Sequence, residues 1–327
     1  KPSAPKCCRM EKRTSDFSLP RMSDVVHILT GPTACGKSAL ALEWACLHGA
    51  EVLSCDALQV YRAMDIGTAK PTLPERVRVR HHLIDVAEVD EPFSVKAFSL
   101  KAFEAAQDVF SRGKKLLVVG GSGFYLKSFY TAVADEVAVP ETIANEVQDI
   151  EARQGIEGLR VRLEEFNPDG LGNLDTQNPR RLVSALKRCL ASGKTLAQLR
   201  AEFEKLNSPF DNWPRKTVLL QRGADSLKQR AHARAKKMIQ DGLVDEVRAL
   251  LPRLKKNPSA ASAIGYREVI EWLEGGQARP LEVLAEKIGQ DTCALLRKQR
   301  TWFNHQITPD KVLNLDETQP DLQTLFE

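Results

Sequence analysis

Residues 31–38, GPTACGKS, match the phosphate-binding loop pattern G-x-x-x-x-G-K-[ST] at every fixed position. The apolar, β-branched run VVHILT precedes this loop and the helix-forming run ALALEWACLHG follows it, so a strand should enter the loop and a helix should leave it. Such a loop turns backbone N–H groups and a helix N-terminus toward a phosphate group. The segment therefore predicts an α/β fold that binds a di- or triphosphate, without saying which one or whether a phosphoryl group moves.

Individual loop positions suggest how the phosphate is held. Gly31 and Gly36 permit a tight backbone with positive φ, and Lys37 adds a positive charge. The Ser38 hydroxyl is a ligand for Mg²⁺, so Mg²⁺ is the expected cofactor and Ser38 its expected protein ligand. Cys35 occupies a variable position of the pattern, which favours a space-filling role over a reactive one.

Strands and helices alternate in the first part of the chain. Apolar runs predict strands at residues 25–30, 51–56, 81–86, 115–123 and 217–222, and residues 94–113 predict a helix. This alternation indicates a parallel sheet, whose functional groups gather at the carboxyl ends of the strands. Gly31, Asp56 and Ser122 all fall at such ends. Most of the chain after residue 222 reads as helical.

The expected architecture is a P-loop NTPase-like parallel sheet core with a helical insertion domain and helical C-terminal elements. Residues 1–24 are polar and rich in proline, and predict a flexible N-terminal tail. Strand signals stop over residues 135–193, which are expected to form the insertion. Residues 25–134 and 194–327 then make up the core and its C-terminal helices.

Composition narrows the class of protein. Hydrophobic residues make up 43% of the chain, and no run of eighteen apolar residues occurs, so no membrane partner is expected. The first residues lack the apolar block of a secretory signal, so we expect a cytoplasmic location. Seven cysteines without a C-x-x-C pair argue against a disulfide framework or a zinc site. A monomer is expected, because no long apolar helix stripe is left over.

Positive charge is concentrated in the second half, although the net charge is only +4. The clustered residues are Arg180, Arg181, Lys187, Arg188, Arg230, Arg234, Lys236, Lys237, Arg297, Lys298 and Arg300. Solvated helix faces produce such a pattern, and so does a surface that binds a polyanion.

Asp56 follows a predicted strand and has several possible roles. A kinase would use a carboxylate here to hold magnesium or to accept a proton from a hydroxyl group. Any transfer to a nucleophile with a removable proton could use it as a general base. A helix N-cap or turn residue is the structural alternative.

The chain resembles the tRNA dimethylallyltransferase family, also called tRNA isopentenyltransferases, from about residue 25 to residue 303. Nine motifs occur in the family's order: GPTACGKS, DALQVYRAMDIGTAKP, HHLIDV with EPFSVKAF, GGSGFYLKS, NPRRLVSALKR, ASGKTLAQL, GLVDEVRAL, AIGYRE and RKQRTWF. The zinc-finger tail of eukaryotic relatives is absent after Phe303, which indicates the bacterial type.

The resemblance implies transfer of a dimethylallyl group from dimethylallyl diphosphate to the exocyclic N6 amine of the adenine beside the anticodon of tRNA. The P-loop would then hold the diphosphate leaving group and stabilise its developing charge. The implied diphosphate-binding residues are Gly31, Pro32, Thr33, Ala34, Cys35, Gly36, Lys37, Ser38 and Arg234. For Arg234, a solvated helix charge is an equally good interpretation.

The resemblance also implies roles for the acceptor side. Asp56 would be the general base at the adenine amine, Ser122 would supply a second hydroxyl, and Gln59 would help to read a flipped-out base. The implied tRNA-binding residues are Asp56, Ala57, Leu58, Gln59, Asn178, Pro179, Arg180, Arg181, Ala263, Ile264, Gly265, Tyr266, Arg267, Glu268, Arg297, Lys298, Gln299 and Arg300. The insertion would clasp the anticodon stem-loop. Tyr266, Trp302 and Phe303 could equally be core aromatics.

The chain departs from the family pattern at a few positions. Ala57 stands where serine is usual, which removes one hydroxyl beside Asp56, and Ser122 replaces a threonine but keeps its hydroxyl. Arg300 replaces an apolar residue and Asn304 an arginine, so the last tRNA segment matches less well.

Other functions explain parts of the sequence. A small-molecule P-loop kinase accounts for residues 31–38 and little else. An isopentenyltransferase acting on free adenine nucleotides shares the loop but needs neither the insertion nor the AIGYRE and RKQRTWF segments. An RNA-binding module with a decayed site is disfavoured, because Lys37, Ser38 and Asp56 are all intact.

Overall fold

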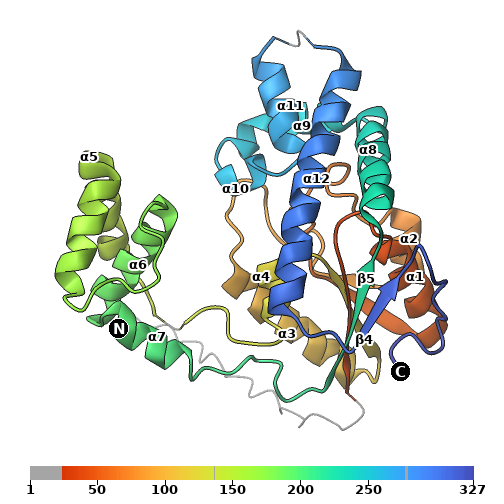
Figure 1. Cartoon of the computed structure of the whole chain (residues 1–327), viewed down its shortest axis with the longest axis horizontal. Coiled ribbons are helices and arrows are strands. Elements are labelled where there is room, and N and C mark those ends of the chain that lie inside the picture. Colours follow the sequence, from red (N-terminus) through yellow and green to blue (C-terminus); the bar gives the residue numbers. More distant parts are fainter. Residues whose placement is uncertain (1–23, 136, 277–278) are drawn as a thin grey trace, which may run out of the picture.

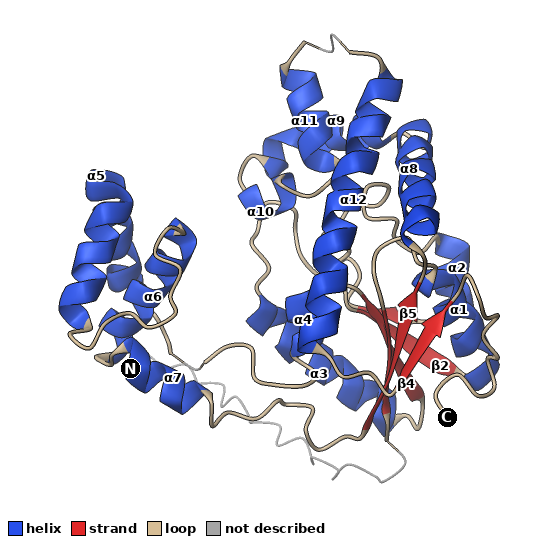
Figure 2. Cartoon of the chain, viewed as in Figure 1, coloured by secondary structure: helices blue, strands red, loops and turns tan. Residues whose placement is uncertain are grey.

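A parallel sheet forms the core of the larger part of the protein (Figure 2). The computed structural model describes residues 24–135, 137–276 and 279–327. The strands are β1 (Val26–Thr30), β2 (Ala50–Ser54), β3 (His81–His82), β4 (Lys115–Gly120), β5 (Arg215–Gln221) and β6 (Lys311–Asn314). Their order is β3-β2-β4-β1-β5-β6, and every pair is parallel. The predicted α/β fold with a parallel sheet core is confirmed.

Alternate side chains of each strand pack into two different apolar layers, because successive residues of a strand point to opposite faces. Val26 and Ile28 of β1 join one core cluster with α3 (Val95–Ser111) and α4 (Gly123–Lys127). Leu29 joins the other cluster with α1 (Lys37–His48). The sheet is therefore buried on both faces, as parallel sheets require.

The predicted strands differ in how well they match. The strand at residues 25–30 and the helix at residues 94–113 are found within a residue or two as β1 and α3. The strand predicted at residues 81–86 is wrong beyond His82, because Leu83 and Asp85 adopt left-handed backbone angles. Strand β6 falls in the region that was expected to be mostly helical.

Helices after β5 rise from the carboxyl edge of the sheet (Figure 1). They are α8 (Ala224–Gln240), α9 (Leu243–Leu254), α10 (Pro258–Ala261), α11 (Tyr266–Glu274) and α12 (Leu281–Gln306). Helix α12 packs along α8, and its C-terminal part reaches α4. The short helix α2 (Leu73–Arg78) lies earlier in the chain and begins with a Thr72 capping box. No helix in the described part of the chain is long and apolar enough to cross a membrane.

A second helical unit stands apart from the sheet (Figure 1). It contains α5 (Glu141–Phe166), α6 (Pro179–Ser192) and α7 (Leu196–Phe203). Buried residues such as Leu159 and Leu186 form its own apolar cluster, which Leu199 of α7 completes. The apolar core of the unit thus continues past residue 193, where the predicted insertion ends. Of the predicted N-terminal tail, residues 1–23 lie outside the described residues.

Candidate active site

The P-loop, Asp56 and Ser122 follow three neighbouring strands. Strand β4 lies between β2 and β1, so the loop after β1, Asp56 after β2 and Ser122 after β4 all lie at one edge of the sheet. Because all three strands are parallel, this is their carboxyl edge, where α/β proteins bind ligands. The sequence prediction that these groups gather at strand ends is confirmed.

The backbone of the P-loop requires glycine where it is most crowded. Gly31 has φ 148°, and a Cβ there would lie 2.4 Å from the carbonyl oxygen of Leu220. Gly36 has φ 108° and is the N-cap residue of α1. Since glycine has no side chain to cap the helix, the first amides of α1 are left for an anion. Ser38, on the first turn of α1, is exposed.

Lys37 bridges the inside of the loop. Its Nζ donates hydrogen bonds of 2.8 Å to the carbonyl oxygens of both Gly31 and Pro32. A Cβ placed on Gly121 would lie 3.7 Å from the same Nζ. The ammonium group therefore lies between the P-loop and the turn that leads to Ser122, beside the expected diphosphate.

Gln299 of α12 forms hydrogen bonds with both the P-loop and the turn that leads to Ser122. Its Oε1 accepts a hydrogen bond from the Thr33 amide (2.8 Å), and its Nε2 donates to the carbonyl oxygen of Gly121 (3.2 Å). The sequence predicts a tRNA contact at Gln299, whereas the structure places its amide group on the P-loop. No local pattern in the sequence announces a contact between residues so far apart.

Asp56 uses only part of its hydrogen-bonding capacity. Its Oδ1 accepts hydrogen bonds from the amides of Leu58 (2.9 Å) and Gln59 (3.4 Å), as in an Asx turn. In the described part of the chain, no donor bonds to Oδ2. One oxygen thus holds the side chain in place, and the other is available to a substrate amine.

Ser122 links the ends of β4 and β2. Its Oγ accepts a hydrogen bond from the Ala57 amide (2.9 Å), so the hydroxyl hydrogen remains able to donate to a further acceptor. The alanine at position 57 therefore still takes part in the site through its backbone. Leu58, the next residue, is half-buried and packs against the core.

Gln59 is bonded at both ends of its amide group. Its Oε1 accepts from the Ser54 hydroxyl (2.8 Å), and its Nε2 donates to the carbonyl oxygens of Thr68 (3.3 Å) and Ala69 (3.4 Å). These bonds attach the turn at residues 65–70 to the end of β2. The predicted role of Gln59 in base reading stays a prediction.

Arg234 of α8 points toward the same turn. Its Nη2 is 3.5 Å from the carbonyl oxygen of Thr68. Burial lowers the pKa of Arg234, and the negative charge of Asp56 opposes that shift. The structure thus brings this predicted diphosphate ligand into the electrostatic field of Asp56, which favours a role in the site over a solvated helix charge.

Glu246 of α9 organises the turn at residues 65–70, and sequence reasoning did not single it out. Its carboxylate accepts hydrogen bonds from the amides of Asp65 (2.9 Å), Ile66 (2.7 Å) and Gly67 (3.2 Å), and from the hydroxyl of Tyr266. A carboxylate that accepts from several backbone amides is a strong anchor. The only signal in the sequence was the GLVDEVRAL motif as a whole.

The AIGYRE segment lies behind this turn and is largely buried. The side chains of Tyr266 and Glu268 are buried, as are Ala263 and Gly265, whereas Ile264 and Arg267 are half-buried. Burial raises the pKa of Tyr266, and the nearby charge of Glu246 adds to the shift. Of the two interpretations of Tyr266, the structure supports a core aromatic.

Comparisons with known proteins agree with this geometry. The sequence model of the IPP transferase family matches residues 59–306. The chain belongs to this family. It is 51% identical over 286 residues to a tRNA dimethylallyltransferase of Opitutus terrae. This alignment covers 87% of this chain and 91% of the relative. A tRNA dimethylallyltransferase of Oceanobacillus iheyensis is 36% identical over 287 residues, 88% of this chain and 90% of the relative.

A solved structure of the same family has a similar fold. The crystal structure of a tRNA delta(2)-isopentenylpyrophosphate transferase from Staphylococcus epidermidis superposes with a TM-score of 0.63 and 27% sequence identity. The match covers 92% of this chain and 96% of that one. It therefore includes the parallel sheet and most of the surrounding helices.

In this IPP transferase, the NPRR segment opens α6 on the separate helical unit. Asn178 is the N-cap residue, and its side chain accepts a hydrogen bond from the Arg181 amide (3.4 Å). Pro179 occupies the first helical position, where the missing N–H costs nothing. Arg180 and Arg181 are exposed, as a surface for phosphate contacts requires.

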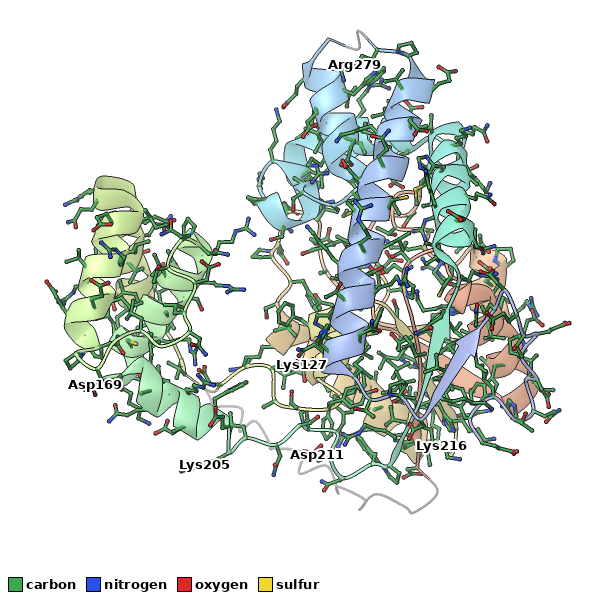
Figure 3. The ribbon with its side chains drawn as sticks, viewed as in Figure 1. Lys127, Asp169, Lys205, Asp211, Lys216 and Arg279 are labelled. Carbon is green, nitrogen blue, oxygen red and sulfur yellow. The ribbon has the colours of Figure 1, made fainter. Side chains whose placement is uncertain are left out.

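A second exposed basic surface lies at the C-terminal half of α12. Arg297, Lys298 and Arg300 are exposed. A shallow depression beside them is lined by Arg297, Lys298, Thr301, Trp302, His305 and Gln306. Lys127 Nζ of α4 donates a hydrogen bond to Gln306 Oε1 (3.4 Å), and Phe124 on the same helix is 71% exposed. Figure 3 labels Lys127 near the C-terminal end of α12. Sequence reasoning missed Phe124 and Lys127, because nothing local shows that α4 lies beside α12. Phe303 is buried, so it is a core aromatic.

Proposed function

We propose that this IPP transferase transfers a dimethylallyl group from dimethylallyl diphosphate to the N6 amine of an adenine in tRNA. The observation that carries the proposal is the position of the P-loop, Ser122 and Asp56 at the ends of the neighbouring strands β1, β4 and β2. An anion-binding loop thus faces a carboxylate that can accept a proton. The tRNA dimethylallyltransferase relatives described above support the same reaction.

The P-loop is proposed to bind the diphosphate. Cleavage of the allylic C–O bond leaves negative charge on the departing pyrophosphate, which the α1 amides and Lys37 would stabilise. The Lys37 ammonium group already lies beside the loop, because it donates hydrogen bonds to the carbonyl oxygens of Gly31 and Pro32. Arg234 is proposed as a further diphosphate contact, because it lies close enough to Asp56 for their charges to interact.

Mg²⁺ is proposed as the cofactor. The Ser38 hydroxyl is exposed at the first turn of α1, which suits a hard, oxygen-preferring cation. The described residues contain no group of three His, Cys, Asp or Glu side chains fit to hold a metal. Ser38 and the diphosphate oxygens would therefore supply the ligands, as is usual for Mg²⁺. When bound, the ion would neutralise charge on the leaving group.

Asp56 is proposed as the general base. The adenine N6 attacks the allylic carbon, the carbon–oxygen bond to diphosphate breaks, and the N6 proton passes to the carboxylate. The oxygen Oδ2 carries no bond to a described residue, and Oδ1 is held by two amides, so the base is oriented before the substrate arrives. Ser122 would supply a second hydroxyl beside the reacting amine.

Two basic surfaces are proposed to bind the anticodon stem-loop. One is the start of α6 with Arg180 and Arg181, and the other is the C-terminal half of α12 with Arg297 and Lys298. Phosphate contacts would supply salt-dependent affinity, while the base inserted at Asp56 supplies specificity. The monomeric state and the cytoplasmic location expected from the sequence remain proposals.

A labelled-substrate assay tests the function. Radiolabelled dimethylallyl diphosphate and Mg²⁺ are incubated with the protein and unmodified tRNA, AMP or ATP. Label in tRNA alone is the expected result. Label in AMP or ATP alone would replace the proposal by a free-nucleotide prenyltransferase, and ATP hydrolysis without prenyl transfer would replace it by a kinase.

The role of Asp56 is tested by Asp56→Asn. Asparagine retains an oxygen for the amides of Leu58 and Gln59 but cannot take the proton, so kcat should fall by about 10²–10⁴. The Kd for tRNA should stay within about threefold, because the turn geometry survives. An Asn variant with normal kcat beside an inactive Asp56→Ala variant would mean that Asp56 only holds the turn.

A further inference from the structure

Two carbonyl groups of the P-loop accept hydrogen bonds from arginine side chains that follow β5. The Cys35 oxygen accepts a hydrogen bond from Arg222 Nε (2.9 Å), and the Ala34 oxygen accepts one from Arg230 Nε (2.6 Å). Ala34 has φ 63°, a left-handed conformation that costs a non-glycine residue free energy. The loop therefore needs external bonds to hold its shape.

The bond at Cys35 controls the direction of an amide in the anion site. A trans peptide unit is planar, and its C=O and N–H point in opposite directions. A hydrogen bond that fixes the Cys35 oxygen therefore also fixes where the Gly36 N–H points. Gly36 is the N-cap residue of α1, at the position where a P-loop amide meets phosphate.

Arg222 is itself held by the end of the C-terminal strand. Its Nη1 donates to the carboxylate of Asp316 and to the carbonyl oxygen of Leu315 (3.3 Å). The other oxygen of Asp316 accepts from the Gly223 amide (2.7 Å), and Ser226 Oγ also donates to this carboxylate (3.0 Å). The Arg222 side chain is only 18% exposed, so this network restricts the guanidinium to one place.

The segment that carries Asp316 is attached at both ends. Strand β6 pairs with β5, and Asn314 lies opposite Gln221. Arg222 is the residue after Gln221, and Asp316 is two residues after Asn314. Further on, the carbonyl oxygen of Leu322 is 3.0 Å from His48 Nε2, and Phe326 packs edge-on against Trp44 of α1. This segment, residues 307–327, lies outside the residues that the family model matches.

We propose that Arg222 and Asp316 are positioning residues for the diphosphate site, and that β6 with its following turn is part of that site. Asp316 orients Arg222, Arg222 orients the Cys35–Gly36 peptide, and the Gly36 amide meets the diphosphate. A cation bonded to the peptide oxygen also strengthens the N–H as a donor. The inference rests on the proposed function only in taking the ligand as a diphosphate.

Three variants and a matched control test the relay. Arg222→Lys keeps a positive charge but cannot bridge Cys35 and Asp316, and Asp316→Asn keeps an acceptor but loses the charge. The double variant combines both. Asp310→Asn is the control, because Asp310 lies at the other end of β6 and its carboxylate bonds a backbone amide of β5, that of Thr217 (2.6 Å), away from the loop.

The measurements are the Kd for inorganic pyrophosphate with Mg²⁺, by calorimetry, and the KM values for dimethylallyl diphosphate and tRNA. We expect Arg222→Lys and Asp316→Asn each to weaken pyrophosphate and diphosphate binding by about 5- to 20-fold, about the size of one ordinary hydrogen bond. The KM for tRNA should change by less than about twofold. The double variant should be no weaker than Arg222→Lys alone, because the residues act in series.

Each contrary result has its own meaning. Asp316→Asn could bind pyrophosphate normally while Arg222→Lys binds it more weakly. That result would make Arg222 a direct ligand and remove Asp316 from the proposal. An equal loss in Asp310→Asn would mean that β6 acts only through general stability, and so would overturn it. Wild-type protein that binds pyrophosphate but does not prenylate tRNA would refute the proposed function while the relay stands, and failure to bind pyrophosphate would refute the relay.

Discussion

Residues 178–181 and residues 263–268 both match family stretches expected to contact tRNA, yet the structure places them in opposite environments. Arg180 and Arg181 are exposed on the separate helical unit. Tyr266 and Glu268 are buried, and the ring of Tyr266 lies against Gly67 in the turn at residues 65–70. The first segment presents charge to solvent, where a polyanion can meet it. The second supports the turn that carries the Arg234 and Gln59 contacts.

The comparison shows that a motif can serve a site without touching the substrate. Tyr266 donates to Glu246, Glu246 holds the amides of residues 65–67, and that turn presents the Thr68 carbonyl oxygen to Gln59 and Arg234. Support of this kind should affect kcat and stability, whereas a surface contact should affect the KM for tRNA and its salt dependence. The two segments can be separated by which constants change.

The largest effect is expected at the anchor of the buried segment. Glu246→Gln removes the charge that three backbone amides share, and should destabilise the fold by about 1–3 kcal/mol. Displacement of the Thr68 turn should lower kcat by about 100-fold, since small misplacements at a site are costly. Thermal unfolding and steady-state kinetics measure both. A normal kcat would show that the turn does not organise the site.

The exposed segment should respond differently. Replacing Arg180 and Arg181 together by alanine should raise the KM for tRNA about 10-fold and leave kcat and the melting temperature unchanged. The slope of log Kd against log salt should fall by about 1–2, one for each lost phosphate contact. Filter binding at several salt concentrations measures it. An unchanged slope would remove α6 from the tRNA surface.

A smaller effect is expected for Tyr266→Phe, which deletes only the hydroxyl bonded to Glu246. The buried ring remains, so stability should fall by about 1 kcal/mol and kcat by about fivefold. The KM for tRNA should stay constant. A tenfold rise in this KM without loss of stability would mean that Tyr266 contacts RNA, and the contrast between the two segments would disappear.

The effect on tRNA binding should also be small for Arg267→Ala within the buried segment. Arg267 bonds Asp291 (2.9 Å) and the buried carboxylate of Glu268, and its side chain is 42% exposed. Removing Arg267 leaves the buried carboxylate of Glu268 without its cationic partner, so stability should fall by about 1–3 kcal/mol. The KM for tRNA should change by less than about twofold, because the segment is largely buried. A rise in the KM for tRNA as large as that expected for the Arg180 and Arg181 double variant would place Arg267 on the tRNA-binding surface.

Much of the site could be predicted from local sequence. Short continuous apolar runs identified most strands, and their parallel arrangement placed the P-loop, Asp56 and Ser122 at one edge. Strand β3 was predicted too long, because Asp85 turns toward Lys70 and Arg76 through contacts distant in sequence. Strand β6 was missed because four residues carry too weak a periodic signal.

The amino-acid sequence alone determined the anion-binding loop, the carboxylate and hydroxyl at strand ends, and the α/β class, because each depends on spacing within one or two adjacent elements. The strand order that makes these ends neighbours came from the tertiary structure. Only the tertiary structure decided which motif residues reach the substrate side and which support it. Glu246, Gln299 and Arg222 act on backbone groups far away in the chain. Burial and hydrogen-bond partners depend on how distant segments pack, and no local pattern encodes that packing.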